Sequence, residues 1–142
     1  MIKDIRHSGI VVDNLSASLD FYRDLLGFKI VKQAEESSSF ISNILGLVDV
    51  KLTTVKMSVS DGQLIELLYY HTHQKESEQK AINDIGLTHI AFTVNDVEAM
   101  YNQLKTKGIY FVSEPQISPN NYAKVAFCQA PEGTFIELVE VL

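Results

Sequence analysis

Two stretches of the chain decide its fold because they repeat each other. They read Ile5-Arg6-His7-Ser8-Gly9-Ile10-Val11-Val12 and Leu87-Thr88-His89-Ile90-Ala91-Phe92-Thr93-Val94. Both are rich in β-branched and apolar residues, which favours a strand, and both carry a histidine at the third position. Aligning the two histidines keeps the register beyond the strands, and after one deletion it places Gly27 on Gly108. The chain is therefore predicted to contain two copies of one structural unit.

A helix is predicted after each of these strands. The strands are followed by Asp13-Asn14 and Asn95-Asp96, whose side chains favour turns and helix starts. Apolar side chains then recur at helical spacing, as Leu15, Leu19, Tyr22, Leu25 and Leu26 in the first copy and Val97, Met100, Tyr101 and Leu104 in the second. Gly27 and Gly108 are the expected helix stops.

Three extended segments follow each helix. They span Lys29 to Gln33, Lys51 to Ser60 and Leu64 to Tyr70 in the first copy, and Tyr110 to Ser113, Ala123 to Gln129 and Thr134 to Val141 in the second. Short glycine turns, Ser60-Asp61-Gly62 and Pro131-Glu132-Gly133, predict hairpins between the last two strands of each copy. The sequence therefore predicts an α+β fold of two tandem βαβββ modules.

The 142 residues suffice for one domain, which we expect over residues 1–142. Module one is predicted over 1–70 and module two over 86–142, joined by a polar connection, 71–85, with room for a short helix. The first copy is longer, and the extra residues fall between Ala34 and Val50. Phe40, Ile41, Ile44 and Leu45 would lie on one face of a short helix there, which either caps the core or forms a pocket wall.

The composition limits the class of partner. A net charge of −6 argues against nucleic acid and anionic membrane surfaces, so a small-molecule substrate is expected. The charged start Met1-Ile2-Lys3-Asp4 does not resemble a signal peptide, and no apolar run is long enough for a membrane span, which together predict a cytoplasmic protein. The single cysteine, Cys128, lies in an apolar strand and is expected to be a buried core residue.

Each copy also carries one histidine and one glutamate at matching places. They are His7 and Glu66 in the first copy, and His89 and Glu137 in the second. Both glutamates interrupt apolar strands, where an unpartnered carboxylate would be costly to bury, so a compensating cation is expected. Two imidazoles and two carboxylates without thiolate suit nickel, cobalt, manganese, iron(II) or zinc. We therefore predict that these four residues are the ligands of a divalent metal ion.

Two further histidines, His71 and His73, lie in the connection without a repeat counterpart, and a solvated segment is the expected reading. The chain has no nucleophile elbow, phosphate loop or dinucleotide glycine fingerprint. This argues against serine hydrolases, P-loop proteins and nicotinamide enzymes.

The repeated motifs resemble the vicinal oxygen chelate superfamily, which includes glyoxalase I, methylmalonyl-CoA epimerase, extradiol dioxygenases and the fosfomycin and bleomycin resistance proteins. The markers are His7 with Val12-Asp13-Asn14-Leu15, Phe21-Tyr22-Arg23-Asp24-Leu25-Leu26-Gly27-Phe28, His89-Ile90-Ala91-Phe92, and Pro131-Glu132-Gly133-Thr134-Phe135-Ile136-Glu137-Leu138. The resemblance implies that the modules form an open barrel-like cleft with the four ligands around a metal. It also implies a homodimer.

The resemblance further implies a divalent-metal-dependent isomerase or lyase of the glyoxalase type, either lactoylglutathione lyase-like or epimerase-like. Its reaction would be proton transfer through a metal-stabilised enediolate or enolate, with Glu137 or Glu66 as the base. Val11 stands where bacterial glyoxalase I carries an arginine for glutathione, which argues against glutathione as the thiol. The alternatives are a dioxygenase or fosfomycin-type transferase, and a non-catalytic drug- or metabolite-binding resistance protein. The presence of Glu66 beside the other three ligands disfavours both.

Overall fold

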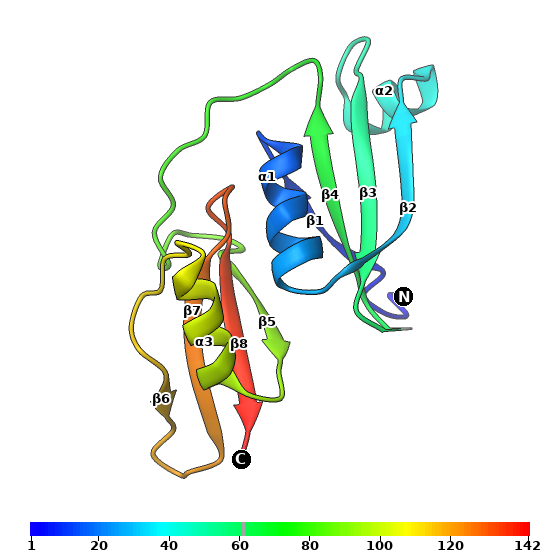
Figure 1. Cartoon of the computed structure of the whole chain (residues 1–142). Helices are drawn as coiled ribbons and strands as arrows, with labels where there is room; N and C mark the ends of the chain where they lie inside the picture. The colour runs from blue at the N-terminus through cyan, green and yellow to red at the C-terminus, as the bar shows by residue number, and fades with distance from the viewer. Residues whose placement is uncertain (61) are drawn as a thin grey trace. The chain divides into compact units, whose positions relative to one another are not determined.

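The computed structural model describes residues 1–60 and 62–142. These residues form two compact units, Met1–Ser77 and Glu78–Leu142. Each unit is a four-stranded mixed sheet with a helix on one face, so the predicted α+β class and the order strand, helix, strand, strand, strand are confirmed for both copies (Figure 1).

The first unit is built on strands β1 (His7–Val11), β2 (Lys29–Glu36), β3 (Leu52–Ser58) and β4 (Leu64–Tyr70). Their order in the sheet is β1-β4-β3-β2, with β1 parallel to β4 and the other pairs antiparallel. β2 runs three residues beyond its predicted end. The β3–β4 hairpin is confirmed by its antiparallel register, although Asp61 of its predicted turn lies outside the described residues.

The first helix begins where the sequence predicts but changes its geometry midway. Helix α1 (Leu15–Leu19) is capped by Asn14, whose Oδ1 accepts from the Ala17 amide at 3.0 Å, and it continues as the π-helical segment η1 (Asp20–Leu25). A wider turn rotates the later side chains relative to a regular helix. The buried residues are Ser18, Phe21 and Tyr22, whereas the predicted leucines are only half-buried. Of the predicted apolar face, Tyr22 is therefore fully buried and the four leucines are partly buried.

The second unit contains β5 (His89–Thr93), α3 (Val97–Thr106), β6 (Gln116–Ile117), β7 (Ala123–Gln129) and β8 (Phe135–Val141). Its sheet order, β5-β8-β7-β6, repeats that of the first unit. Helix α3 packs on β7 and β8, and Asp96 caps it by accepting from the Ala99 amide at 2.9 Å. The turn at Pro131-Glu132-Gly133 closes a β7–β8 hairpin as predicted, with Gly133 at φ 94°.

The edge of the second sheet differs from the prediction. Tyr110 to Ser113 does not form a continuous strand: only Phe111 bridges to Cys128, and regular pairing resumes at Gln116. Pro115 lacks an amide donor and restricts the backbone of Glu114, so the ladder breaks between these points.

The insertion in the first unit forms helix α2 (Ser39–Leu45), which ends at Gly46 with φ 65°. Its apolar face is exposed, with Phe40 at 67% and Ile44 at 61% relative exposure, and none of its residues is buried. The reading in which this helix caps the core is therefore wrong. The insertion lengthens the unit without adding to its buried core.

The remaining sequence predictions concern the connection and the cysteine. No helix forms between residues 71 and 85 in this fully described segment. His71 and His73 are both exposed, in agreement with the expected solvated segment. Each ring also makes one contact with the first unit, because His71 Nε2 lies 2.7 Å from Thr53 Oγ1 and His73 Nε2 lies 2.7 Å from the Val48 carbonyl oxygen. Cys128 is fully buried, as expected. Among the described residues, no helix has the length and apolarity to span a membrane.

Candidate functional site

Side chains alternate across the strands, so each sheet has a helix-packed face and a helix-free face. In the first unit Val55, Met57, Ile65 and Leu67 point to the helix-packed face and are at most 4% exposed. His7 and Glu66 have the opposite parity and therefore share the helix-free face. In the second unit Ile136 and Leu138 are core residues, and His89 and Glu137 lie on the other face.

Each unit brings its own histidine and glutamate together. His7 Nε2 lies 3.4 Å from Glu66 Oε2, and His89 Nε2 lies 3.4 Å from Glu137 Oε2. The strand registers are also equivalent, because His7 pairs with Leu64 and His89 pairs with Phe135, two residues before each glutamate. The two copies in the sequence therefore place the histidine Nε2 and the glutamate Oε2 at the same distance from each other.

The surroundings of the two pairs differ at one position of the register. Lys56 lies directly opposite Glu66 on β3, and its Nζ is 3.7 Å from the same Oε2 that faces His7. Phe127 occupies the equivalent place opposite Glu137 on β7, and its ring meets the ring of His89 edge-on at 5.4 Å. Glu66 is held between two cationic or polar partners, whereas Glu137 faces one imidazole and an aromatic ring.

The two glutamate side chains also differ in their exposure to solvent. The Glu66 side chain is 10% exposed and the Glu137 side chain 23% exposed. A carboxylate with fewer partners and more exposure is freer to move and to exchange a proton. Glu137 is therefore better suited than Glu66 to the role of base.

The donor set fits a divalent transition metal in its chemistry. Each pair offers one imidazole nitrogen and one carboxylate oxygen on the helix-free face, and neither pair includes a thiolate. Across the described ranges 1–60 and 62–142, no group of three or more histidine, cysteine, aspartate or glutamate residues gathers to hold an ion. Each unit by itself presents one imidazole and one carboxylate.

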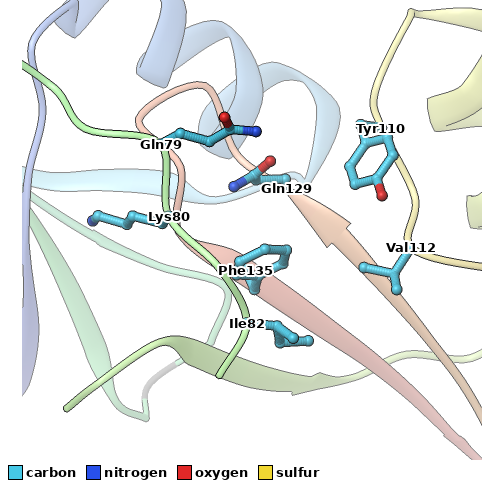
Figure 2. A pocket seen from close by; sticks show the side chains of 7 residues that line it. All are labelled: Gln79, Lys80, Ile82, Tyr110, Val112, Gln129 and Phe135. Carbon is cyan, nitrogen blue, oxygen red and sulfur yellow. The ribbon is translucent and has the colours of Figure 1, made fainter. Parts of the chain in front are cut away.

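A pocket of about 370 Å³ lies in the second unit on the same face as His89 and Glu137 (Figure 2). Its walls come from the connection, the edge segment and the central strands: Gln79, Lys80, Ile82, Tyr110, Val112, Gln129 and Phe135. Figure 2 shows the side chains of Gln79, Gln129, Phe135 and Ile82 around this pocket. The Gln129 amide donates to the Gly133 carbonyl oxygen at 3.0 Å, which fixes its orientation. The pocket combines apolar side chains with the amides of Gln79 and Gln129 and the charged Lys80.

Several of these residues were missed by the sequence reading. Lys56 stands in a strand of otherwise apolar and small polar residues, and its cross-strand position opposite Glu66 becomes visible only once the register is known. Phe135 shares the strand and the face of Glu137, which alternation along the strand indicates, whereas Phe127 and Gln129 lie on β7 and are placed only by the register between the strands.

The chain is similar to known proteins over most of its length. Residues 4–138 match the model of the Glyoxalase/Bleomycin resistance protein/Dioxygenase superfamily. The lactoylglutathione lyase of Schizosaccharomyces pombe is 29% identical over 95% of this chain, and the chain spans about half (46%) of that protein's length. The metallothiol transferase FosB of Staphylococcus haemolyticus is 31% identical over 74% of this chain and 60% of its own length.

A solved structure supports the same assignment at the level of fold. A glyoxalase family protein from Bacillus cereus superposes with a TM-score of 0.90 over 100% of this chain and 96% of its own, at 23% sequence identity. The matched model covers nearly the whole chain, including all four residues of the two His–Glu pairs. The chain therefore belongs to the Glyoxalase/Bleomycin resistance protein/Dioxygenase superfamily.

Proposed function

We propose that the protein is a divalent-metal-dependent isomerase or lyase of the glyoxalase type, and that His7, Glu66, His89 and Glu137 together hold its metal ion. The observation that carries this proposal is the identical His–Glu spacing in the two units, 3.4 Å in each case. Such duplication of a ligand pair is hard to explain by core packing, because buried carboxylates lower stability unless a cation compensates them.

In the proposed reaction, the metal ion and the residues of the protein have different roles. When bound, nickel, cobalt, manganese, iron(II) or zinc would supply a Lewis acid that polarises two adjacent substrate oxygens. The two imidazoles belong to the first residues of β1 and β5, and each of these strands pairs with the strand that carries the glutamate of the same unit. Glu66 is the more buried of the two carboxylates and acts as a stationary ligand.

Glu137 is the proposed base. Its carboxylate takes the proton from a carbon that bears one of the substrate oxygens, and returns it to the neighbouring carbon. A hydroxyl proton moves between the two oxygens in the same sense, so the reaction is an isomerisation that needs no oxidant or reductant. Phe127, directly opposite Glu137 on β7, adds no charge beside this carboxylate, and its ring meets the His89 ring edge-on.

The names of the relatives support a lyase or transferase of this superfamily at the level of reaction class. A thioester-forming isomerisation of an α-oxo-aldehyde adduct, as the name lactoylglutathione lyase implies for the S. pombe protein, fits the ligand set proposed for this chain. The open helix-free face at Val11, which is 60% exposed, carries no arginine for the glutathione carboxylates. We therefore propose a thiol adduct or acyl thioester other than that of glutathione. We also propose a homodimer that works in the cytoplasm.

Proton exchange measured by NMR in D₂O is the direct test. Protein loaded with each metal is incubated with methylglyoxal adducts of several thiols and with acyl-CoA thioesters. We expect deuterium to enter the carbon next to the carbonyl in the wild type and in Lys124→Met, a control on the same sheet whose lysine pairs with Glu98 at 3.8 Å. We expect Glu137→Gln to bind metal but to exchange no proton. Exchange at an undiminished rate in Glu137→Gln would overturn the assignment of the base.

A further inference from the structure

The helix-free face of the first sheet carries lysine side chains that have no role in the proposed metal chemistry. In the paired register, Lys32 of β2 lies opposite Lys56 of β3, Lys56 opposite Glu66 of β4, and Glu66 opposite Gly9 of β1. Residues that are directly opposite point to the same face of a sheet, so both lysines and Glu66 share it. Lys29 follows on the same edge strand, opposite Ser58. We call Lys29, Lys32 and Lys56 the lysine cluster.

Fold stability does not explain this arrangement. Like charges directly opposite each other on paired strands are destabilising, and Lys32 and Lys56 form such a pair. Glu66 is the recorded partner of Lys56, whereas within the described part of the first unit no carboxylate is ion-paired with Lys29 or Lys32. The cluster therefore has a net positive charge even with Glu66 ionised.

The charges at the proposed metal site also leave a net positive charge on this face. A divalent ion with two glutamate ligands and two neutral imidazoles is neutral overall. Lys56, whose Nζ is 3.7 Å from a ligand oxygen of Glu66 and whose side chain is 30% exposed, adds one positive charge within reach of a substrate. Phe127 adds none at the matching place in the second unit.

We propose that Lys56, with Lys32 and Lys29, is an anion-binding subsite that selects substrates carrying a carboxylate or phosphate group in addition to the two adjacent oxygens. This inference rests on the proposed function, because it names the substrate class of that same site. Lys56 acts as the specificity residue, since it is the member of the cluster next to a proposed metal ligand. The anionic group replaces Glu66 as the partner of Lys56 when a metal neutralises Glu66.

The subsite can be tested without metal. Inorganic phosphate is titrated into chelator-treated protein, and binding is followed by the amide resonances of β2 and β3. Removing the competing carboxylate in Glu66→Gln should strengthen phosphate binding about threefold, as expected for one partly exposed charge pair. Lys56→Met should weaken it by a similar factor, the double variant Lys32→Met/Lys56→Met should abolish it, and Lys124→Met should leave it unchanged. Equal titrations in the wild type and both lysine variants would overturn the subsite.

Metal-loaded protein provides the second arm. Acetohydroxamate and a hydroxamate of similar size with an added carboxylate both present two adjacent oxygens. We expect the carboxylated compound to bind about five- to tenfold more tightly to the wild type and to Lys124→Met, the range of a charge-assisted contact, with the preference lost in Lys56→Met. Equal affinity of the two compounds for a metal-loaded wild type would contradict the inference and leave the proposed function intact. Absence of metal binding would contradict the proposed function, and the phosphate titration would still decide the subsite.

Discussion

The two units present the same pair of ligand atoms in different settings. In the first unit Glu66 lies between His7 and Lys56 and is 10% exposed, and in the second Glu137 lies beside His89 and Phe127 and is 23% exposed. The strand register is the same in both, so the difference arises from one cross-strand residue. The two units therefore repeat the His–Glu pair, and the residue opposite each glutamate, Lys56 or Phe127, gives the two carboxylates different surroundings.

The largest effect should come from exchanging the two glutamates for glutamine. Glu137→Gln should lower the turnover number by about 10²- to 10⁴-fold, the usual contribution of a positioned general base. Glu66→Gln should lower it much less, because an amide oxygen can still act as a ligand. Turnover numbers of the two variants at matched metal occupancy provide the measurement. Equal losses would mean that the two carboxylates share the proton-transfer step.

Substitutions of Lys56 and Phe127, the residues opposite the two glutamates, should change the metal affinity in opposite directions. Lys56→Met frees Glu66 from a competing cation and should tighten metal binding by about tenfold, whereas Phe127→Lys should weaken it by a similar factor, as expected for one charge pair that is partly shielded from water. Competition with a fluorescent chelator gives both values, with Lys124→Met as the control. Changes of the same sign in both variants would contradict the assigned environments.

The helices should differ in how much they stabilise their units. Leu104 of α3 is 1% exposed, and Leu104→Ala should lower the free energy of unfolding by about 2–5 kcal/mol. Leu25, at the end of η1, is only half-buried, so Leu25→Ala should cost less than Leu104→Ala. Urea denaturation of both variants compares them directly. A larger loss for Leu25→Ala would show that the π-helical segment packs more tightly than its exposure indicates.

The smallest expected effect concerns Cys128 of the second unit. Burial raises the pKa of its thiol from 9.0 to about 12. In the unfolded chain the thiol ionises near 9, so its contribution to stability is complete below pH 9 and is lost as the pH rises from 9 towards about 12. Thiol-specific reagents at pH 8 should react with Cys128 only after unfolding. Rapid labelling of the native protein would show that this residue is accessible.

The sequence predicted the fold well where periodicity and repetition determine it. The strands Leu64–Tyr70 and Ala123–Gln129 were predicted to the residue, because alternation and flanking turns define them. The apolar face of the first helix was not, since a π-helical turn changes which side chains face the sheet. The prediction of a continuous strand over residues 110–113 was wrong, because strand propensity does not reveal an interruption caused by a proline a few residues later.

The candidate site was predicted in part. The sequence singled out His7, Glu66, His89 and Glu137 from their matching repeat positions, and the structure shows one His–Glu contact within each unit. Lys56 and Phe127 were not predicted, because cross-strand neighbours depend on the register between strands, which one sequence does not define. The joint role of all four ligands stays a prediction.

Metal content per chain tests the central claim most directly, namely that the two pairs together hold one ion. Protein purified without a His-tag or chelator is analysed by mass spectrometry for nickel, cobalt, manganese, iron and zinc, alongside His7→Ala, His89→Ala and the control Lys124→Met. We predict about one transition metal ion per chain in the wild type and in the control, lost in each histidine variant, as expected when both pairs contribute ligands to one centre. Metal that persists in either histidine variant, or two ions per chain with one lost in each, would contradict a shared centre.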